Sequence, residues 1–552
     1  MKKILVVNLT RFGDLLQTSP TIMGLKELWP DAELTALVER NFADVCRGLP
    51  AVDRVRELDL DGLGRTMLGD TTASFREAYR VVEDLVAELR AERFDLALNY
   101  SSSRMSAVLL GLIRAADTRG WTMTGAGHRL IAHRWSRLFS ASCLVRRQAP
   151  FNLVDYYKRA AGVQGGPRRL FFTVPEPARA RAAEVLAGAQ LVPGTPLIAF
   201  QLGASRAVRR WPAVHYVAVA RALEARVGAR VLLCGGGGDR PVAEEIRAAL
   251  GELAIDVCGR TSIAELGALL ARADVLVTPD TGPMHMAVAV GTPVVALFFG
   301  PALPFDTGPY APDHVCLHAE VACAPCDHNV TCLDPFCRDT LAPEAVADAV
   351  VARRAGDWAA LAAAAERWPQ VRWYRTGFDA EGLADVTPLG RRPVTRLEHL
   401  RRAYRALWKT VLDGAPPPAG PVRLEREAAT VRELVGLARA AAAQAAVVEV
   451  LASRPEPDLG ALEAAAMQLE EHDAALFRFG AMHEPATLLV QMFRFEKENI
   501  EGDDVAALAT ATRVLHEELE ARGRVLANLL EPRTAAPAAG WMGAGGEHAS
   551  LC

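Results

Sequence analysis

The segment that most constrains the fold spans residues 274–299, which read as strand, turn, helix and strand in immediate succession. Residues 274–278 and 294–299 are apolar runs, and the short helical stretch between them stops at Gly291, a typical residue just after a helix C-terminus. Open α/β sheets bind ligands at the carboxyl ends of their strands. The segment therefore predicts an α/β sheet with a binding site in the turn after Thr278.

Strands and helices alternate in two separate sets along the chain. The expected strands are residues 3–9, 34–38 and 94–99 in the first set, and 197–202, 230–234, 274–278 and 294–299 in the second. The first helix is expected at residues 15–29, and a stretch rich in Pro and Gly separates the sets. This pattern predicts two Rossmann-like domains that face a cleft, at residues 1–170 and 195–355.

Beyond about residue 355 the pattern changes from strands to helices. Segments rich in Ala, Leu, Arg and Glu predict helices near residues 395–413, 424–453, 459–478 and 503–531. We therefore expect a helical appendage over residues 390–531, arranged as a small bundle. Residues 532–552 are rich in Ala, Gly and Pro and predict a disordered tail.

Composition narrows the class of protein. The net charge is only −4 over 552 residues, so no global field favours a nucleic-acid partner. We find no run of the roughly 20 apolar residues that a membrane span needs, and the first residues favour a buried strand over a signal peptide. Ten cysteines in such a chain then favour the reducing cytosol. A cytoplasmic location is expected.

The turn after Thr278 has the residues of a phosphate site. Thr281 can cap the following helix, Pro283 suits its first turn, and Gly282 lets the backbone approach a ligand closely. A helix N-terminus offers free N–H groups and a positive dipole end to an anion. His285 is then expected beside the phosphate. The alternative is a capped helix whose histidine only packs.

Polar residues follow two other strands of the second set. Ser205, Arg206, Arg209 and Arg210 come directly after the strand at 197–202, where they can neutralise a pyrophosphate; a solvated basic loop is the alternative. The glycine run after Cys234 does not have the G-x-G-x-x-G spacing of a dinucleotide site. It leaves Asp239 as a candidate ribose ligand.

Asp14 is the candidate catalytic residue of the first half. It follows Gly13 at the end of the first strand, on the side that faces the expected cleft. A carboxylate across a cleft from a phosphate site can serve as the general base of a glycosyl transfer. An aspartate that only caps a helix is the alternative.

Residues 1–355 resemble the ADP-heptose–lipopolysaccharide heptosyltransferase family, glycosyltransferase family 9. The resemblance rests on Gly13-Asp14, on Arg-Arg-Trp-Pro at 209–212, and on Asp-Thr-Gly-Pro-Met-His at 280–285 followed by Gly-Thr-Pro at 291–293. It implies a GT-B fold and an inverting transferase that needs no cofactor for its chemistry.

The resemblance also assigns roles to individual residues. Asp14 matches the catalytic base, and Ser205 and Arg209 match phosphate-contacting groups, although the family usually has lysine where Arg209 stands. The remaining donor residues form the turn: Asp280, Thr281, Gly282, Met284 and His285. Lysine and arginine present different donor geometries, so the contact made by Arg209 is expected to differ from that of the family.

A basic, aromatic stretch in the first half predicts the acceptor site. Residues 118–154 contain no Asp or Glu, and Arg119, Arg129 and Arg134 are the expected ligands of a phosphorylated or acidic glycolipid. Such a stretch also predicts peripheral contact with the inner face of the inner membrane. A merely solvated basic face is the alternative.

Four cysteines cluster within fifteen residues of an expected loop: Cys323, Cys326, Cys332 and Cys337. Four thiolates suit zinc or iron, and some relatives of the resembled family hold iron by four cysteines with a different spacing. Free thiols or a redox disulfide are the alternatives.

The function expected from these features is heptose transfer from ADP-heptose to a lipopolysaccharide core or related surface glycan. Two alternatives stay open. One is a GT-B glycosyltransferase that uses another nucleotide sugar, since residues 234–239 and 259–262 do not determine the base. The other is a non-catalytic scaffold that acts through the helical appendage.

Overall fold

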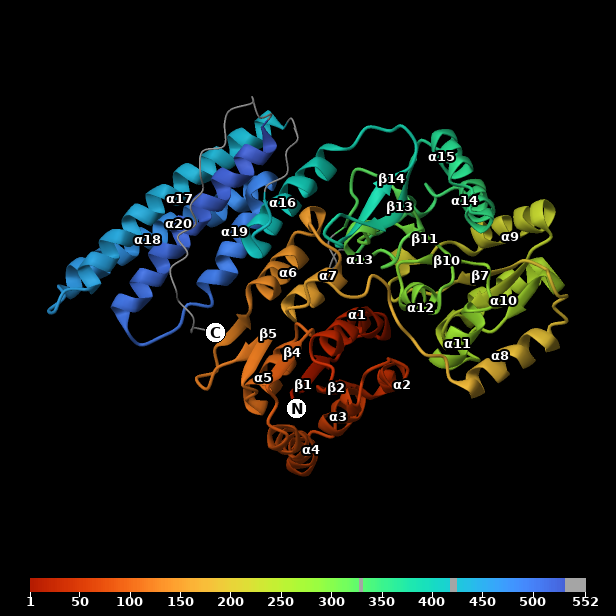
Figure 1. The fold of residues 1–552 in the computed structure, drawn as a ribbon, viewed down its shortest axis with the longest axis horizontal. Helices are drawn as coiled ribbons and strands as arrows, with labels where there is room; N and C mark the ends of the chain where they lie inside the picture. Colours follow the sequence, from red (N-terminus) through yellow and green to blue (C-terminus); the bar gives the residue numbers. More distant parts are fainter. Residues whose placement is uncertain (327–330, 417–423, 532–552) are drawn as a thin grey trace. The chain divides into compact units, whose positions relative to one another are not determined.

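The computed structural model describes residues 1–326, 331–416 and 424–531, and Figure 1 traces them. The chain divides into two compact units. The first holds residues 1–101, 112–118 and 151–393, and the second holds residues 102–111, 119–150 and those from Val394 onward. The tail expected at 532–552 lies outside the described residues.

The first unit contains two sheets. In one of them, four parallel strands run in the order β3-β2-β1-β4. Their bounds are β1 (Lys3–Asn8), β2 (Glu33–Glu39), β3 (Arg54–Leu58) and β4 (Leu96–Asn99). The crossovers carry α1 (Phe12–Leu28), α2 (Ala43–Arg47), α3 (Leu60–Met67) and α4 (Thr72–Ala91). Strands β1 and β4 read as continuous apolar runs because both faces of a parallel sheet are covered by helices.

The second sheet of this unit has eight strands in the order β14-β13-β12-β11-β10-β7-β8-β9. Their bounds are β7 (Leu197–Gln201), β8 (Arg230–Cys234), β9 (Ala254–Asp256), β10 (Val275–Pro279), β11 (Val294–Phe298), β12 (Val315–Ala319), β13 (Val371–Phe378) and β14 (Ala384–Pro388). The strands from β7 to β12 pair in parallel. The helices of this half are α8 (Glu176–Gly188), α9 (Ala213–Val227), α10 (Arg240–Leu250), α11 (Ile263–Leu270), α12 (Gly282–Val290), α13 (Pro304–Thr307), α14 (Pro343–Ala355) and α15 (Trp358–Arg367), whereas α7 (Leu153–Ala160) contacts α1.

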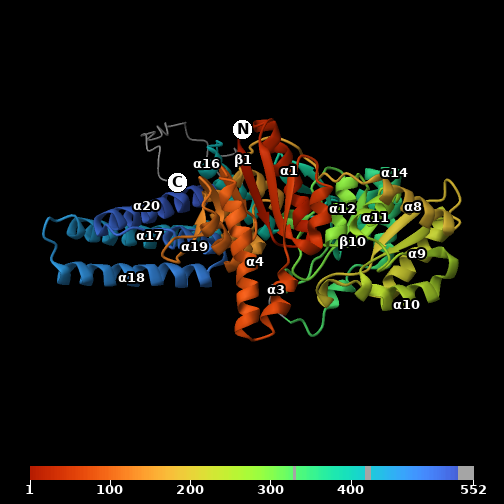
Figure 2. The ribbon, with the colours of Figure 1, turned by 90° about the horizontal axis from the view of Figure 1, so that it is seen from below.

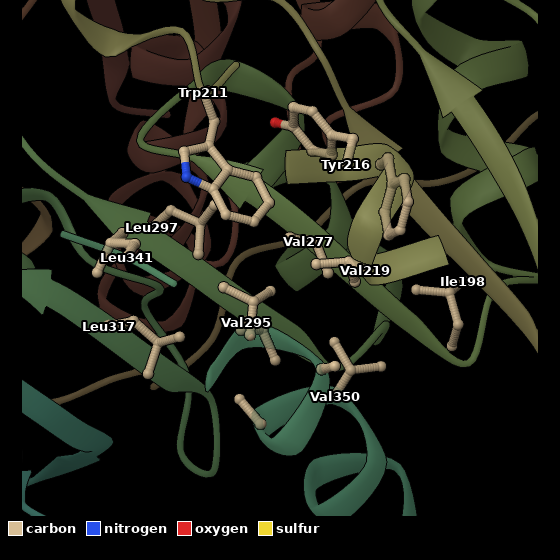
Figure 3. Packing of buried hydrophobic residues seen from close by; sticks show 14 of the residues in the cluster. Ile198, Trp211, Tyr216, Val219, Val277, Val295, Leu297, Leu317, Leu341 and Val350 are labelled. Carbon is tan, nitrogen blue, oxygen red and sulfur yellow. The ribbon is translucent and has the colours of Figure 1, made fainter. Parts of the chain in front are cut away.

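Side chains from this sheet and its helices interlock in one apolar cluster (Figure 3). Val277 and Val295 lie on neighbouring central strands, while Val350 comes from α14. The fully buried Tyr216 keeps its hydroxyl satisfied by donating to the carbonyl of Gln201 at 2.7 Å, as a buried polar group must. The carboxyl ends of β7 and β10 are thereby held on a rigid support.

The expected end of the strand pattern near residue 355 is wrong. Strands β13 and β14 form an antiparallel hairpin, and β13 pairs antiparallel with β12. Val371 and Trp373 on β13 are buried in the apolar cluster. Arg372 separates these two residues and Arg375 follows Tyr374, so the segment does not read as an apolar run, although Val, Trp and Tyr at 371–374 are strong strand formers.

The second unit consists of a hairpin and helices. Strands β5 (Asp117–Met123), which begins in the first unit, and β6 (Arg129–Ala132) pair antiparallel, and α5 (Arg104–Ile113) and α6 (Arg134–Leu144) flank them in sequence. The remaining helices are α16 (Arg396–Asp413), α17 (Glu425–Ala452), α18 (Leu459–Met482), α19 (Glu484–Lys497) and α20 (Val505–Leu530). Four helical segments were expected here, but α19 forms a fifth, started by Pro485 at its N-terminus.

Helices α17, α18 and α20 lie alongside one another (Figures 1 and 2). At Gly523 the two helices α17 and α20 approach closely, because an added Cβ there would lie 2.7 Å from Val435 Cγ2. Among the described residues, α17 is long and apolar enough to cross a membrane by length and composition alone, with a mean hydropathy of 1.6 in its best window. The expectation that no segment passes this test is therefore wrong. Alanines that pack within the bundle, such as Ala438 and Ala445, contribute to this hydropathy.

Candidate active site

The N-terminal ends of α1 and α12 meet within the first unit. A Cβ added to Gly13 would lie 2.9 Å from Gly282 Cα, and one added to Gly282 would lie 2.3 Å from the ring of Phe12. Both distances are shorter than ordinary van der Waals contact, so only glycine fits at the two positions. The contact brings the turn after β1 against the turn after β10.

Asp14 and His285 lie in the first turns of these two helices. Helix α1 begins at Phe12, earlier than the expected residue 15, so Asp14 is the third helical residue and not the N-cap. Its carboxylate accepts a hydrogen bond from the Arg11 backbone N–H at 3.4 Å. His285 Cδ2 would lie 3.2 Å from a Cβ on Gly13.

His285 is 4% exposed, and its Nδ1 has no hydrogen-bond partner among the described residues. Burial lowers the pKa of this imidazole, against the opposing effect of the Asp280 and Asp14 carboxylates. The ring is therefore neutral at pH 7. A buried ring nitrogen that lacks a partner is available to a ligand.

Arg209 connects the two donor turns of the second half. Its guanidinium donates to the Asp280 carboxylate at 3.2 Å and to the Asp280 backbone carbonyl at 3.1 Å. It also donates to the Ser205 hydroxyl at 2.6 Å. The structure thus brings together three of the residues that the sequence predicted as donor ligands.

The loop that carries Arg209 is supported by the segment around Arg338. The guanidinium of Arg338 donates to the carbonyl of Arg210 at 3.1 Å, and the Trp211 indole donates to the carbonyl of Arg338 at 3.1 Å. Val208 packs against Gly300. These contacts fix the backbone of the basic loop without using its charge.

Thr281 is the N-cap residue of α12, but its side chain makes no capping hydrogen bond. The expectation that it caps the helix through its hydroxyl is wrong. Its Oγ1 instead lies 3.1 Å from the hydroxyl of Thr278, and this pairing leaves the first N–H groups of the helix without a side-chain cap. Met284 is fully buried, so its side chain belongs to the core, and its backbone N–H donates to Thr281 O at 3.0 Å.

Asp239 organises its own glycine turn. Its carboxylate accepts from the Gly236 N–H at 2.8 Å, and it lies so close to Gly203 that an added Cβ there would be 1.9 Å from Oδ2. The residue therefore holds the two turns after β7 and β8 together. Its role as a ribose ligand stays a prediction.

Arg119, Arg129 and Arg134, the predicted acceptor residues, belong to the second unit. The guanidinium of Arg129 stacks on the Trp121 ring, 4.2 Å from its centroid. Arg134 lies 3.5 Å from the Glu518 carboxylate of α20. Arg119 lies on β5. The role of these residues in binding an acceptor stays a prediction.

The four clustered cysteines are not arranged as a metal site. No group of three or more His, Cys, Asp or Glu residues in the described part of the chain could hold a metal ion. Cys323 is exposed and Cys337 is buried, and burial raises the pKa of the Cys326 and Cys337 thiols, with smaller effects from the neighbouring cysteines. The binding of zinc or iron by these cysteines stays a prediction.

Two contributors to the site were missed in the sequence. Phe12 packs its ring on Gly282, and Arg338 supports the basic loop through backbone carbonyls. Phe12 carried a signal, because it stands next to Gly13 in the first turn. Arg338 is far from the loop in sequence and gave none.

Two Rossmann-like halves, with the turn after β1 in contact with the turn after β10, have the architecture of a glycosyltransferase of the GT-B fold. Residues 82–336 match the model of glycosyltransferase family 9 (heptosyltransferase). The C-terminal helices lie beyond the match.

Curated relatives agree with the family match. The chain is 28% identical over 315 residues to a lipooligosaccharide heptosyltransferase 2 of Haemophilus influenzae, an alignment that covers 55% of this chain and 85% of the relative. It is 26% identical over 334 residues to a lipopolysaccharide heptosyltransferase 1 of Pseudomonas aeruginosa, with 59% and 86% covered.

A solved structure supports the fold. The glycosyl transferase family 9 protein of Veillonella parvula superposes with a TM-score of 0.52 at 22% identity, and the match covers 64% of this chain and 98% of that one. At this identity the likeness carries the fold alone.

Proposed function

We propose that the chain transfers heptose from ADP-heptose to a lipopolysaccharide core or a related surface glycan, with inversion at the anomeric carbon. The names of the curated relatives support the heptose and the lipopolysaccharide class of acceptor. The family match supports a nucleotide-sugar donor. We further propose that the protein is cytoplasmic and acts on a glycolipid acceptor at the inner face of the inner membrane.

The observation that carries the proposal is the contact between Gly13 and Gly282. The turn with Asp14 lies directly against the turn with Asp280 and His285, which supports one location for the proposed base and the proposed diphosphate site. In the proposed reaction the Asp14 carboxylate takes the proton of the acceptor hydroxyl. The acceptor oxygen then forms the new bond at the anomeric carbon as the bond to the diphosphate breaks.

Charge that develops on the departing ADP needs donors that are already in place. The guanidinium of Arg209 is held by Asp280 and Ser205, and the N-terminus of α12, which has no side-chain cap, adds the Gly282 backbone N–H and its dipole. The neutral His285 imidazole adds a ring N–H or a lone pair, according to its tautomer. No step of this scheme requires a metal ion.

The direct test offers the purified chain a set of nucleotide-diphosphate sugars and measures nucleotide release with and without a heptose-accepting glycan. Release of ADP from ADP-heptose, dependent on the acceptor, is the expected result. Release from a UDP- or GDP-sugar would move the donor assignment to another nucleotide. Absence of both binding and release for every donor would contradict the proposal and favour a scaffold.

A further inference from the structure

The second unit contains a cavity of about 460 Å³ that the donor chemistry does not use. Residues from three places in the sequence line it: Ser102, the segment from Trp121 to Leu144, and Arg494, Phe495 and Glu498 of and just after α19. Its volume is within the range of small-molecule sites. The lining combines aromatic rings with a few charged groups, which is the usual composition of such sites.

Three aromatic side chains form the apolar part of the lining. Trp121 and Phe495 meet edge to face with their ring centroids 6.0 Å apart, and Phe139 of α6 adds a third ring. Aromatic rings of this kind offer flat apolar surfaces at low cost in conformational entropy. The C–H faces of a sugar ring match such surfaces.

Arginine supplies the charge of the cavity. Arg129 stacks on Trp121 and forms no ion pair with any described residue, so its donors remain available to an anion. Arg494 Nε lies 2.9 Å from Glu498 Oε1, and Glu498 is the acidic residue of the lining. The lining segment between residues 121 and 144 has no Asp or Glu. The N–H groups of an arginine guanidinium can donate two parallel hydrogen bonds to the oxygens of a phosphate or a carboxylate.

Helix α19 of the appendage forms part of the wall of this cavity. Asn499, at the end of α19, accepts from the Ile131 N–H at 2.9 Å and donates to the Ile131 carbonyl at 2.6 Å. Gln148 likewise accepts from the Leu488 N–H at 3.3 Å. These hydrogen bonds join α19 to the β5–β6 hairpin and to the segment after α6. The wall that holds Arg494 and Phe495 is therefore fixed relative to Trp121 and Arg129.

We propose that this cavity binds a saccharide unit that carries a phosphate or a carboxylate. The aromatic rings pack on the apolar face of the sugar, and Arg129 and Arg494 pair with its anionic group. The helical appendage then works as half of a glycan-binding site and not as a separate scaffold. If the proposed function holds, the saccharide is part of the acceptor glycan. This last identification rests on the proposed function.

The test measures binding of simple sugars to the full chain by saturation-transfer NMR titration. Glucuronate and glucose 6-phosphate are the anionic probes, glucose is the neutral control, and inorganic phosphate tests for an anion site alone. Both anionic sugars are expected to bind at least about tenfold more tightly than glucose or phosphate, because each uses both the rings and the arginines. Equal binding of phosphate and the anionic sugars, or no binding of either sugar, would overturn the proposal.

Variants locate the site. Arg129→Gln is expected to lower the affinity for both anionic sugars by about ten- to hundredfold, the usual effect of losing a charge-assisted contact. Phe495→Leu is expected to lower the same affinities by a smaller factor. Arg439→Gln removes another exposed arginine, on α17, which pairs with Glu520, and serves as the matched control. Unchanged binding in Arg129→Gln, with an unchanged melting temperature, would place the sugar elsewhere.

The two proposals fail separately. Binding of ADP and release of ADP from ADP-heptose report on the first unit, and binding of anionic sugars reports on the cavity. Loss of the sugar affinity with intact donor turnover contradicts the cavity alone. Sugar binding without any donor turnover contradicts the proposed function alone.

Discussion

The two units place their polar residues in opposite ways. In the first unit the interior of the large sheet is apolar, and Ser205, Arg209 and Asp280 lie at the carboxyl ends of its strands. In the second unit charges lie inside the helical bundle. Arg522 forms two hydrogen bonds with Glu496, at 2.5 and 3.1 Å, and both side chains are about 95% buried.

A second buried cluster extends this pattern. His516 is fully buried, and its Nε2 lies 2.7 Å from the Asp473 carboxylate. The other Asp473 oxygen accepts from Lys497. Polar side chains at strand ends lie where open α/β sheets bind their ligands, whereas the charges of this cluster are enclosed by helices. We therefore expect the same residue types to serve ligand binding in the first unit and to fix the packing of the helices in the second.

The largest effect is expected at Asp14. Asp14→Ala should lower kcat by about 10²–10⁴-fold, the usual contribution of a general base, while ADP affinity stays nearly unchanged because the base acts on the acceptor. Steady-state transfer kinetics and calorimetry of ADP binding measure the two quantities. Near-normal turnover in the variant would show that Asp14 is not the general base and that its carboxylate only accepts the Arg11 N–H.

The next largest effect should come from the buried pair of the bundle. Arg522→Met is expected to lower the free energy of unfolding by about 3–5 kcal/mol, because it leaves the Glu496 carboxylate buried without its main partner. Adding Glu496→Leu should restore much of the loss, since no buried charge then remains. Scanning calorimetry of the single and double variants measures this.

Arg439→Ala supplies the surface control for that comparison. Its ion pair with Glu520 is largely exposed on the arginine side, so a change below about 1 kcal/mol is expected. A loss at Arg522 no larger than this would mean that the bundle does not depend on its internal charges.

A smaller, functional effect is expected at the donor turn. His285→Ala and Arg209→Ala should each lower kcat/KM and the affinity for ADP by about ten- to hundredfold, which is the effect of losing one charge-assisted contact. Their double variant should lose less than the sum, because both groups would touch one diphosphate. Calorimetry of ADP binding to the four proteins gives the coupling. Unchanged affinity in both single variants would move the donor elsewhere.

The last effect depends on pH and concerns a buried histidine of the first unit. His314 Nδ1 accepts the Val294 N–H at 3.1 Å. Burial, with a smaller contribution from Arg353 against Asp313, lowers the pKa of His314 to about 3. The folded pKa lies below the ordinary value of 6.5. The contribution of His314 to stability is therefore complete above pH 6.5 and is lost as the pH falls towards 3.

The expected slope is at most about 1.4 kcal/mol per pH unit. Urea unfolding between pH 7.5 and 4.5 measures it, and His314→Leu should unfold with a shallower dependence on pH than the parent. Equal slopes for the two proteins would assign the acid sensitivity to other groups.

The sequence alone determined most of the parallel strands, the turn at Asp280 and the position of Asp14, because each depends on residues that are close together in the chain. A continuous apolar run indicates a strand buried on both faces, and Gly291, with φ of 87°, ends α12 where the pattern placed a stop. Strands β3, β9 and β12 were not among the expected strands, and the hairpin β13–β14 was missed because its arginines keep the segment from reading as an apolar run.

Only the tertiary structure decided which of these turns share one site. The contact of Gly13 with Gly282, the hold of Arg209 on Asp280 and the support from Arg338 join residues far apart in the chain. Four cysteines close in sequence, by contrast, did not form a metal site among the described residues. Periodicity and capping act over a few residues, whereas a site depends on packing between elements, and packing is a property of the folded chain.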